Sequence, residues 1–209
     1  MGKLILSRHG ESEYNAKSLW AGITDTPLTA KGRHEAALMG HALADITPDV
    51  AFTSKLSRAS ETLEIIMREN HWTCPVHASA ALNERDYGDL TGLNKWEIEP
   101  KYGKEQFTKW RRGWDDPVPG GESLKDVYGR VVPYYDAEIK PLAAADQTVL
   151  ITAHGNSLRA LTKYLEHLDD ETIKHTEMIF GTLIIYTITP NGDIKHKEVR
   201  QIDSTPPPA

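Results

Sequence analysis

Two histidine–glycine pairs are the residues of this sequence best suited to chemistry. His9-Gly10 follows Arg8, and His154-Gly155 precedes Asn156. An imidazole can act as a nucleophile or proton carrier near neutral pH, and a neighbouring guanidinium can clamp an anion. Taken alone, each pair is equally compatible with a surface histidine in a polar loop, because short motifs also occur by chance.

The segments before both pairs strengthen the chemical interpretation. Each pair follows a short apolar run, 4–6 or 148–153, that is typical of a buried strand. Apolar residues at helical spacing over 158–165 predict a helix after the second pair. Because open α/β sheets bind ligands at the carboxyl ends of their strands, parallel strands would bring His9 and His154 to one rim.

A third segment predicts an anion site on the same rim. A strand over Val50–Ser54 precedes Arg58, which falls in the first turn of the next predicted helix. A cation is unfavourable at the positive end of the helix dipole, so a bound anion would explain why an arginine occupies this position. Helix N-termini also offer backbone N–H groups to phosphate. Two histidines and two arginines on this rim would form a pocket for a phosphoryl group.

Several motifs together resemble a known family. Arg8-His9-Gly10-Glu11 with His154-Gly155-Asn156 resembles the histidine phosphatase superfamily. The further motifs, which resemble the bisphosphoglycerate-dependent phosphoglycerate mutases, are Leu82–Lys95, Tyr102-Gly103, Trp110–Gly113, Gly121–Ser123 and His154–Ala160. The resemblance runs from about Leu4 to about Arg200. It implies a phosphoglycerate mutase-like fold, an α/β three-layer sandwich with a mostly parallel sheet.

The resemblance implies a division of roles among five residues. His9 is the expected nucleophile, alternating between free and phosphorylated imidazole. Arg8, Arg58 and His154 are expected to neutralise the transferring phosphoryl group, because its transition state requires positioning and electrostatic stabilisation. Glu84 is the expected general acid and base for the substrate hydroxyl.

The resemblance also implies a substrate site, substrates and a cofactor. The expected substrates are 3-phosphoglycerate and 2-phosphoglycerate, the priming donor is 2,3-bisphosphoglycerate, and no metal is expected. The resembled enzymes commonly carry a hydroxyl residue where this chain has Ala21, and Ser12 is a candidate replacement. The expected substrate-binding residues are Arg8, Ser12, Asn15, Ala21, Gly22, Arg58, Glu84, Arg85, Tyr87, Lys95, Arg111, Arg112, Gly155 and Asn156.

Composition limits the classes of function and the compartment. The net charge of −6 argues against a nucleic-acid partner, although residues 94–114 interleave basic and aromatic side chains. Cys74 is the only cysteine, so no intrachain disulfide can form, which is consistent with a reducing compartment. The N-terminus lacks a signal-peptide pattern and no apolar run is long enough for a bilayer, so a cytoplasmic protein without membrane partners is expected. Homo-oligomers are possible.

The remaining pattern predicts one domain over residues 1–209, with 203–209 as a mobile tail. The other predicted elements are helices from Thr29 to about Ala44 and from Ser57 to about Glu69, a short strand over 76–82, two helices over 94–113 broken near Pro100 and Gly103, a helix from Ser123 toward Leu142 kinked at Pro133, a short helix opened by 169–171, and a β-hairpin over 183–199.

The same residues are compatible with two other functions. A phosphatase would use Arg8, His9, Arg58, Glu84 and His154 and let water accept the phosphoryl group. The segment 83–95 and the pair at 111–112 favour a mutase, because a broad phosphatase does not need them. The other candidate is a phospholigand-binding module without turnover, which has no chemical need for the nucleophile, the acid and the second histidine together.

Overall fold

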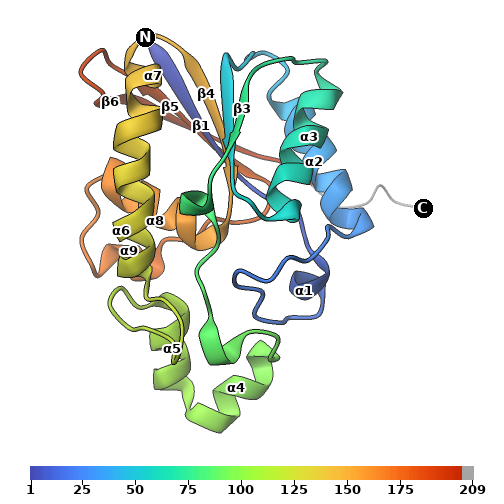
Figure 1. Cartoon of the computed structure of the whole chain (residues 1–209), viewed down its shortest axis with the longest axis vertical. Helices are drawn as coiled ribbons and strands as arrows, with labels where there is room; N and C mark the ends of the chain where they lie inside the picture. The colour runs from blue at the N-terminus through green and yellow to red at the C-terminus, as the bar shows by residue number, and fades with distance from the viewer. Residues whose placement is uncertain (204–209) are drawn as a thin grey trace.

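A computed structural model describes residues 1–203 of the chain. The predicted mobile tail, 203–209, lies outside the described residues except for Asp203. Within the described part, six strands form one sheet with the order β3-β2-β4-β1-β5-β6 (Figure 1). The strands are β1 Gly2–Arg8, β2 Val50–Thr53, β3 Val76–Ala78, β4 Thr148–Ala153, β5 Thr182–Ile188 and β6 Ile194–Gln201.

The four strands from β3 to β1 are parallel, whereas β5 and β6 form an antiparallel hairpin at one edge. The predicted mostly parallel sheet and terminal hairpin are therefore confirmed. In the register of β1 with β4, Arg8 lies opposite Ala153. The residues that follow, His9 and His154, consequently leave the sheet side by side.

Helices cover both faces of the sheet, which confirms the three-layer sandwich (Figure 1). α2 and α3 cover one face, and α6, α7, α8 and α9 lie on the other. Helix bounds are α1 Glu13–Ala16, α2 Ala30–Ala42, α3 Ser57–Glu69, α4 Lys95–Tyr102, α5 Lys104–Arg112, α6 Leu124–Tyr134, α7 Lys140–Ala144, α8 Gly155–Leu165 and α9 Thr172–His175, with 3₁₀ turns at Ala80–Leu82 and Gly88–Leu90 and a π-helical turn at Tyr135–Ile139.

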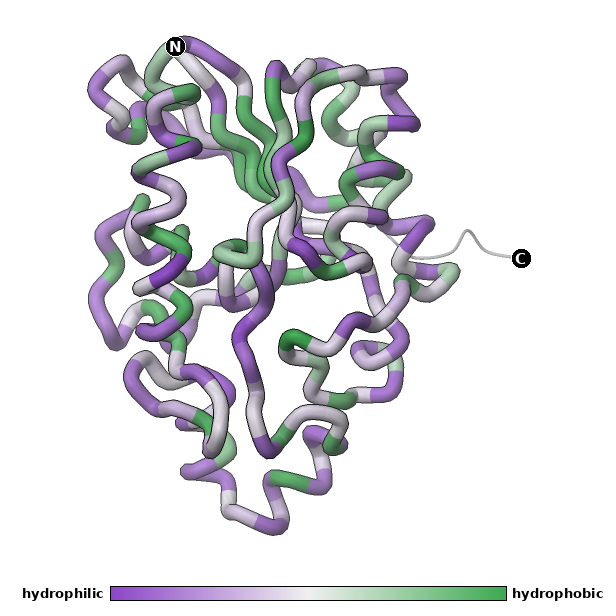
Figure 2. The backbone as a smooth tube through the Cα atoms, in the orientation of Figure 1, coloured by the Kyte–Doolittle hydropathy of each residue, from purple (hydrophilic) through white to green (hydrophobic). Residues whose placement is uncertain are grey.

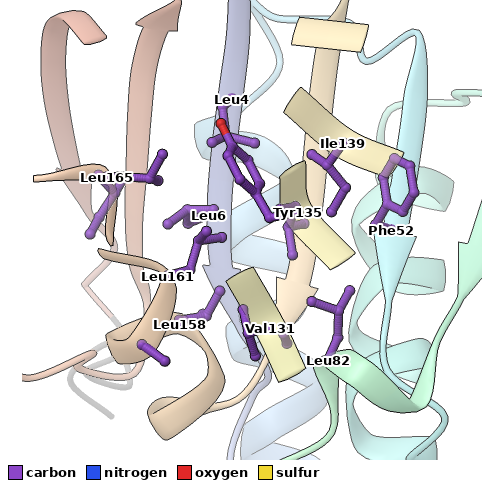
Figure 3. Close-up of a cluster of buried hydrophobic side chains, with 14 of the residues drawn as sticks. Leu4, Leu6, Phe52, Leu82, Val131, Tyr135, Ile139, Leu158, Leu161 and Leu165 are labelled. Carbon is purple, nitrogen blue, oxygen red and sulfur yellow. The ribbon is translucent and has the colours of Figure 1, made fainter. Parts of the chain in front are cut away.

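The alternation of side chains along the central strands divides the core between the two faces. Leu4 and Leu6 of β1 pack with α6 and α8, whereas Ile5 packs with α2 and α3. Figure 3 shows the first cluster, and Figure 2 shows that the central strands are the most apolar part of the backbone. Burying one such leucine or isoleucine side chain stabilises the fold by about 1.5–3 kcal/mol, so these strands anchor the rim that follows them.

α4 and α5 form a separate projection at the site end of the molecule (Figure 1). Their inner side chains pack on Trp20 in a third, small core that includes Phe107 and Trp110. The sequence predicted breaks near Pro100 and Gly103, but only Gly103 separates the two helices. Gly103 has φ +82°, a conformation that glycine tolerates, whereas Pro100 lies within α4 without ending it.

Two other predicted elements have different bounds in the structure. The strand predicted over 76–82 ends at Ala78, because the Ser79 side chain caps a 3₁₀ turn by accepting a hydrogen bond from the Ala81 N–H. The helix predicted from Ser123 continues past Pro133 as a π-helical turn and then as α7 to Ala144. Among residues 1–203, every helix is too short or too polar to cross a bilayer.

Candidate active site

His9 and His154 face each other at the carboxyl ends of β1 and β4. Their ring centroids are 4.9 Å apart, with an edge-to-face orientation. Both side chains are almost completely buried. The rim predicted from the two strand–histidine–glycine patterns is therefore present, because β1 and β4 are parallel neighbours that end at the same level.

The His9 ring is held in an orientation suited to nucleophilic attack. Its Nδ1 lies 2.6 Å from the Gly10 carbonyl oxygen, so a proton on Nδ1 is donated there and Nε2 keeps a lone pair. A Cβ on Gly10 would lie 2.2 Å from the Gly32 carbonyl oxygen, so this close turn requires glycine. Burial, followed by the charges of Arg58 and Arg8, lowers the pKa of His9 well below its usual value, which keeps the imidazole neutral.

His154 has one ring nitrogen engaged and one free. Its Nε2 lies 2.7 Å from the Ser54 hydroxyl at the end of β2. Its Nδ1 is buried and has no hydrogen-bond partner within the described chain. Burial and the charge of Arg58 lower the pKa of His154 as well. The free Nδ1 can therefore donate to a phosphoryl oxygen if it carries the proton.

Arg8 and Arg58 each combine an anchored end with a free donor. Arg58 donates to the carbonyl oxygens of Thr24 and Gly22, both at 2.8 Å, and Arg8 donates to the carbonyl oxygen of Met178 at 2.6 Å. The Nε of each guanidinium is buried and unpartnered among residues 1–203. Unpaired buried donors cost free energy, and an anion that accepts from them would recover it.

Glu84 lies next to this cationic group and is oriented by the backbone. Its Oε1 accepts hydrogen bonds from the N–H of Arg85 at 2.7 Å and of Asn156 at 3.1 Å. The second donor belongs to the first turn of α8, so the helix terminus helps to orient the carboxylate. Oε2 lies 3.6 Å from the position of a Cβ added to Gly155, on the side where Arg8 also lies. Such a carboxylate can exchange a proton with a bound hydroxyl.

Two adjoining cavities contain most of the predicted site residues. The smaller, of about 60 Å³, is lined by Arg8, His9, Asn15, Ala21, Gly22, Arg58, Glu84, Tyr87 and Lys95. The larger, of about 140 Å³, is lined by Arg8, Trp20, Glu84, Tyr87, Lys95, Arg111, Arg112, Gly155, Asn156, Arg159, Glu177 and Met178. Glu84, Tyr87, Lys95 and Arg8 line both, so Glu84 lies where the two cavities meet.

The larger cavity is rich in cations, and among its lining residues Arg112 forms an ion pair with Glu177. Burial, with the charges of Arg8 and Arg111, lowers the pKa of Lys95 to about 8. Burial and the charge of Arg85 lower the pKa of Arg159 to about 10. Burial is the larger cause of both shifts and repulsion from neighbouring cations is the smaller one, so a bound anion would raise both pKa values again. Among residues 1–203 there is no cluster of three or more His, Cys, Asp and Glu side chains suited to a metal.

Comparison with known proteins agrees with this geometry. Residues 4–199 match the family model described as the histidine phosphatase superfamily, branch 1. This chain belongs to the histidine phosphatase superfamily. Two curated relatives carry the name 2,3-bisphosphoglycerate-dependent phosphoglycerate mutase. The protein from Cytophaga hutchinsonii is 44% identical over 97% of this chain and 95% of its own length. The protein from Rhizobium rhizogenes is 48% identical over 95% of each chain.

Solved structures of histidine phosphatase superfamily members share the fold at lower identity. Bacillus stearothermophilus YhfR superposes with a TM-score of 0.81 at 26% identity, covering 98% of this chain and 99% of its own. A mycobacterial glucosyl-3-phosphoglycerate phosphatase, determined with VO3, gives 0.76 at 27% identity and covers 88% of this chain and 92% of its own.

Two predicted substrate-binding residues of this superfamily member do not line either cavity. The Ser12 hydroxyl donates to the Asn15 side-chain oxygen at 2.8 Å and caps α1, so it is not free to replace the hydroxyl missing at Ala21. Arg85 is fully buried; it donates to the carbonyl oxygen of Trp110, and its guanidinium lies 4.6 Å from the centroid of the Tyr87 ring. Both side chains form their hydrogen bonds with other residues of the protein around the site.

Other residues at the site were missed by the sequence interpretation. Arg159 donates to the Asn156 side-chain oxygen at 2.9 Å, and its position one helical turn after Asn156 could have indicated this contact. Phe180 lies under the Arg8 guanidinium at 3.7 Å from the ring centroid, and its own centroid is 6.0 Å from that of His9. Neither Phe180 nor Glu177 carries a sequence signal, because both lie in the connection before β5.

Proposed function

We propose that this protein interconverts 3-phosphoglycerate and 2-phosphoglycerate through a phosphohistidine at His9. The observation that carries the proposal is the position of Glu84 between a phosphoryl-sized anion cavity and a second cationic cavity. A mutase needs both, because the phosphoryl group and the rest of an anionic substrate must be held together. The names of the relatives at 44–48% identity support the same activity.

Priming by 2,3-bisphosphoglycerate agrees with the donors that the site offers. The free Nε atoms of Arg8 and Arg58 and the Nδ1 of His154 are buried donors suited to a phosphoryl group. When bound, 2,3-bisphosphoglycerate supplies the phosphoryl group that charges the enzyme. His9 contributes the attacking Nε2, and the proton on Nδ1 remains with the Gly10 carbonyl.

The transfer step uses Glu84 as the proton carrier. As the substrate hydroxyl attacks the phosphorus of phospho-His9, the nitrogen–phosphorus bond breaks and Glu84 Oε2 takes the hydroxyl proton. The electron pair of that bond returns to His9 Nε2. In the reverse direction the Nε2 lone pair attacks the phosphorus, the bond from phosphorus to the substrate oxygen breaks, and Glu84 returns the proton to the leaving oxygen. Lys95, Arg111 and Arg112 hold the carboxylate and the phosphate that the substrate already carries, so the chosen hydroxyl faces the phosphorus of phospho-His9.

A histidine phosphatase is the second candidate, because solved relatives at 26–27% identity include a glucosyl-3-phosphoglycerate phosphatase. Both reactions would use the smaller cavity, and they differ in whether water or a substrate hydroxyl accepts the phosphoryl group. The larger cavity favours the mutase, because it offers Lys95 and two arginines to the non-reacting end.

The test is an assay of 3-phosphoglycerate conversion with and without added 2,3-bisphosphoglycerate, with phosphate release measured in parallel. We expect conversion to 2-phosphoglycerate that rises strongly with the bisphosphate, and only slow phosphate release. Phosphate release as the main reaction, with no 2-phosphoglycerate formed, would reject the mutase in favour of the phosphatase.

The cellular compartment, the domain organisation and the class of partner are part of the same proposal. We place it in the cytoplasm, as a single domain over residues 1–209, acting on small molecules. The sequence composition supports this, with one cysteine and a net charge of −6.

A further inference from the structure

Glu177 places a second carboxylate in a cavity that is otherwise built for anions. The larger cavity is lined by five cations: Arg8, Lys95, Arg111, Arg112 and Arg159. The two acids among its lining residues are Glu84 and Glu177. Glu84 has a chemical role between the two cavities, whereas the proposed reaction gives Glu177 none. Its carboxylate forms an ion pair with Arg112.

The ion pair is not needed to hold either partner in place. The Arg112 backbone is fixed at the end of α5, where its carbonyl oxygen accepts from Arg159 Nη2 at 3.3 Å. The connection that carries Glu177 is fixed on both sides, because Arg159 Nε donates to the Thr176 carbonyl at 2.9 Å and Arg8 donates to that of Met178 at 2.6 Å. Partly exposed ion pairs also contribute little to stability.

We propose that Glu177 selects ligands by their charge, a role that rests on the proposed mutase function. In the free protein its carboxylate occupies Arg112. A bound substrate must displace it, and Glu177 then remains beside the ligand's non-reacting end. In the unphosphorylated protein 3-phosphoglycerate can place its single phosphate in the smaller cavity and its carboxylate in the larger one, whereas 2,3-bisphosphoglycerate must also place its second phosphate in the larger cavity. Repulsion by Glu177 is greater when this phosphate dianion is present than for the carboxylate alone. Glu177 therefore weakens binding of 2,3-bisphosphoglycerate more than binding of 3-phosphoglycerate.

The test compares dissociation constants of these two ligands, measured by calorimetry on the full-length protein. His9→Asn is present in every variant compared, because 2,3-bisphosphoglycerate would otherwise phosphorylate His9. Glu177→Gln removes the charge and keeps the shape of the side chain. Both ligands should bind more tightly, roughly 2–5-fold for 3-phosphoglycerate and by a larger factor for 2,3-bisphosphoglycerate, as an exposed pair worth up to ~1 kcal/mol allows. Glu177→Asp keeps the charge and should retain the wild-type ratio of the two constants.

Glu105→Gln is the matched control. Glu105 is an acid of α5 that pairs with Lys109 at 2.8 Å, but it does not line the larger cavity. Its loss should leave both constants unchanged. Weaker binding in Glu177→Gln, an equal effect on both ligands, or the same response in Glu105→Gln would each overturn the proposed selectivity.

The proposed mutase reaction can be rejected without rejecting the proposed role of Glu177. If the wild-type protein binds both ligands and Glu177→Gln shifts the ratio as expected, but 3-phosphoglycerate is not converted, the reaction is rejected and the selectivity of the site stands.

Discussion

At the scale of single residues, His9 is the group on which the proposed reaction depends most. We expect His9→Ala to abolish both mutase activity and formation of a phosphoenzyme, because the Nε2 lone pair is lost and the nearby His154 has Nε2 engaged by Ser54. Radiolabelled 2,3-bisphosphoglycerate should leave an acid-labile, base-stable label on the wild type. His34→Ala, at an exposed histidine of α2, is the control and should label normally. A label that persists in His9→Ala would show that another residue is the nucleophile.

Glu84 is the residue on which proton transfer to and from the substrate hydroxyl depends in the proposed reaction. Glu84→Gln keeps an acceptor for the N–H groups of Arg85 and Asn156 but cannot take a proton. We expect kcat to fall by about 10²–10⁴-fold with little change in substrate binding, as for the loss of a general acid or base. Steady-state kinetics would contradict this role if kcat stayed within a few-fold of wild type while KM rose.

Lys95 should make substrate affinity depend on pH. Its pKa of about 8 in the free protein means that it loses its charge as the pH rises through 8. A bound anion favours the protonated amine, so we expect KM for 3-phosphoglycerate to increase above pH 8, by up to roughly tenfold per pH unit. Lys95→Arg keeps its charge over this range and should flatten the profile. An unchanged rise in that variant would assign the titration to another group.

At the scale of elements, α5 separates mutase from phosphatase chemistry. The helix brings Arg111 and Arg112 to the larger cavity, and neither residue lines the smaller one. We expect Arg111→Ala and Arg112→Ala to lower mutase activity far more than any phosphatase activity, by about 10²-fold where the acceptor hydroxyl is misplaced. Lys109→Ala, at an exposed position of the same helix, is the control. Equal losses in both activities would show that these arginines serve the phosphoryl group itself.

At the scale of the whole molecule, the two buried histidines should make the fold sensitive to acid. The pKa of each is lowered in the folded state, so below about pH 6.5 the unfolded chain binds protons that the folded chain does not. The free energy of unfolding should therefore be constant near pH 7.5 and fall as the pH drops below 6.5. At pH 5.5 the loss from both residues is at most about 2–3 kcal/mol, the limit for two imidazoles that stay neutral in the folded state.

Urea unfolding of the wild type and of His9→Asn at pH 7.5 and 5.5 measures this effect. The variant should lose about half as much stability on acidification, because only His154 then contributes. An equal loss in both proteins would mean that other groups, such as surface carboxylates, dominate the acid response.

The sequence alone determined the features that depend on neighbours along the chain. The apolar runs 4–6 and 148–153 predicted two buried strands, and each strand followed by histidine and glycine predicted the rim that joins His9 to His154. These signals are local because strand pleating and helix starts involve only a few consecutive residues. The single-domain prediction and the roles of the site residues remain predictions.

Only the tertiary structure decided which side chains remain free for a ligand. The Ser12 hydroxyl caps α1, and neither Ser12 nor Arg85 lines either of the two cavities, although their positions in the motifs predicted substrate contacts. Arg8 is instead oriented by the carbonyl of Met178, and Arg112 is paired with Glu177. Met178 lies 170 positions after Arg8 in the sequence, and Glu177 lies 65 positions after Arg112. α5 contacts α9, and the connection from α9 to β5 carries Glu177 and Met178. These contacts depend on tertiary packing, which no local sequence pattern indicates.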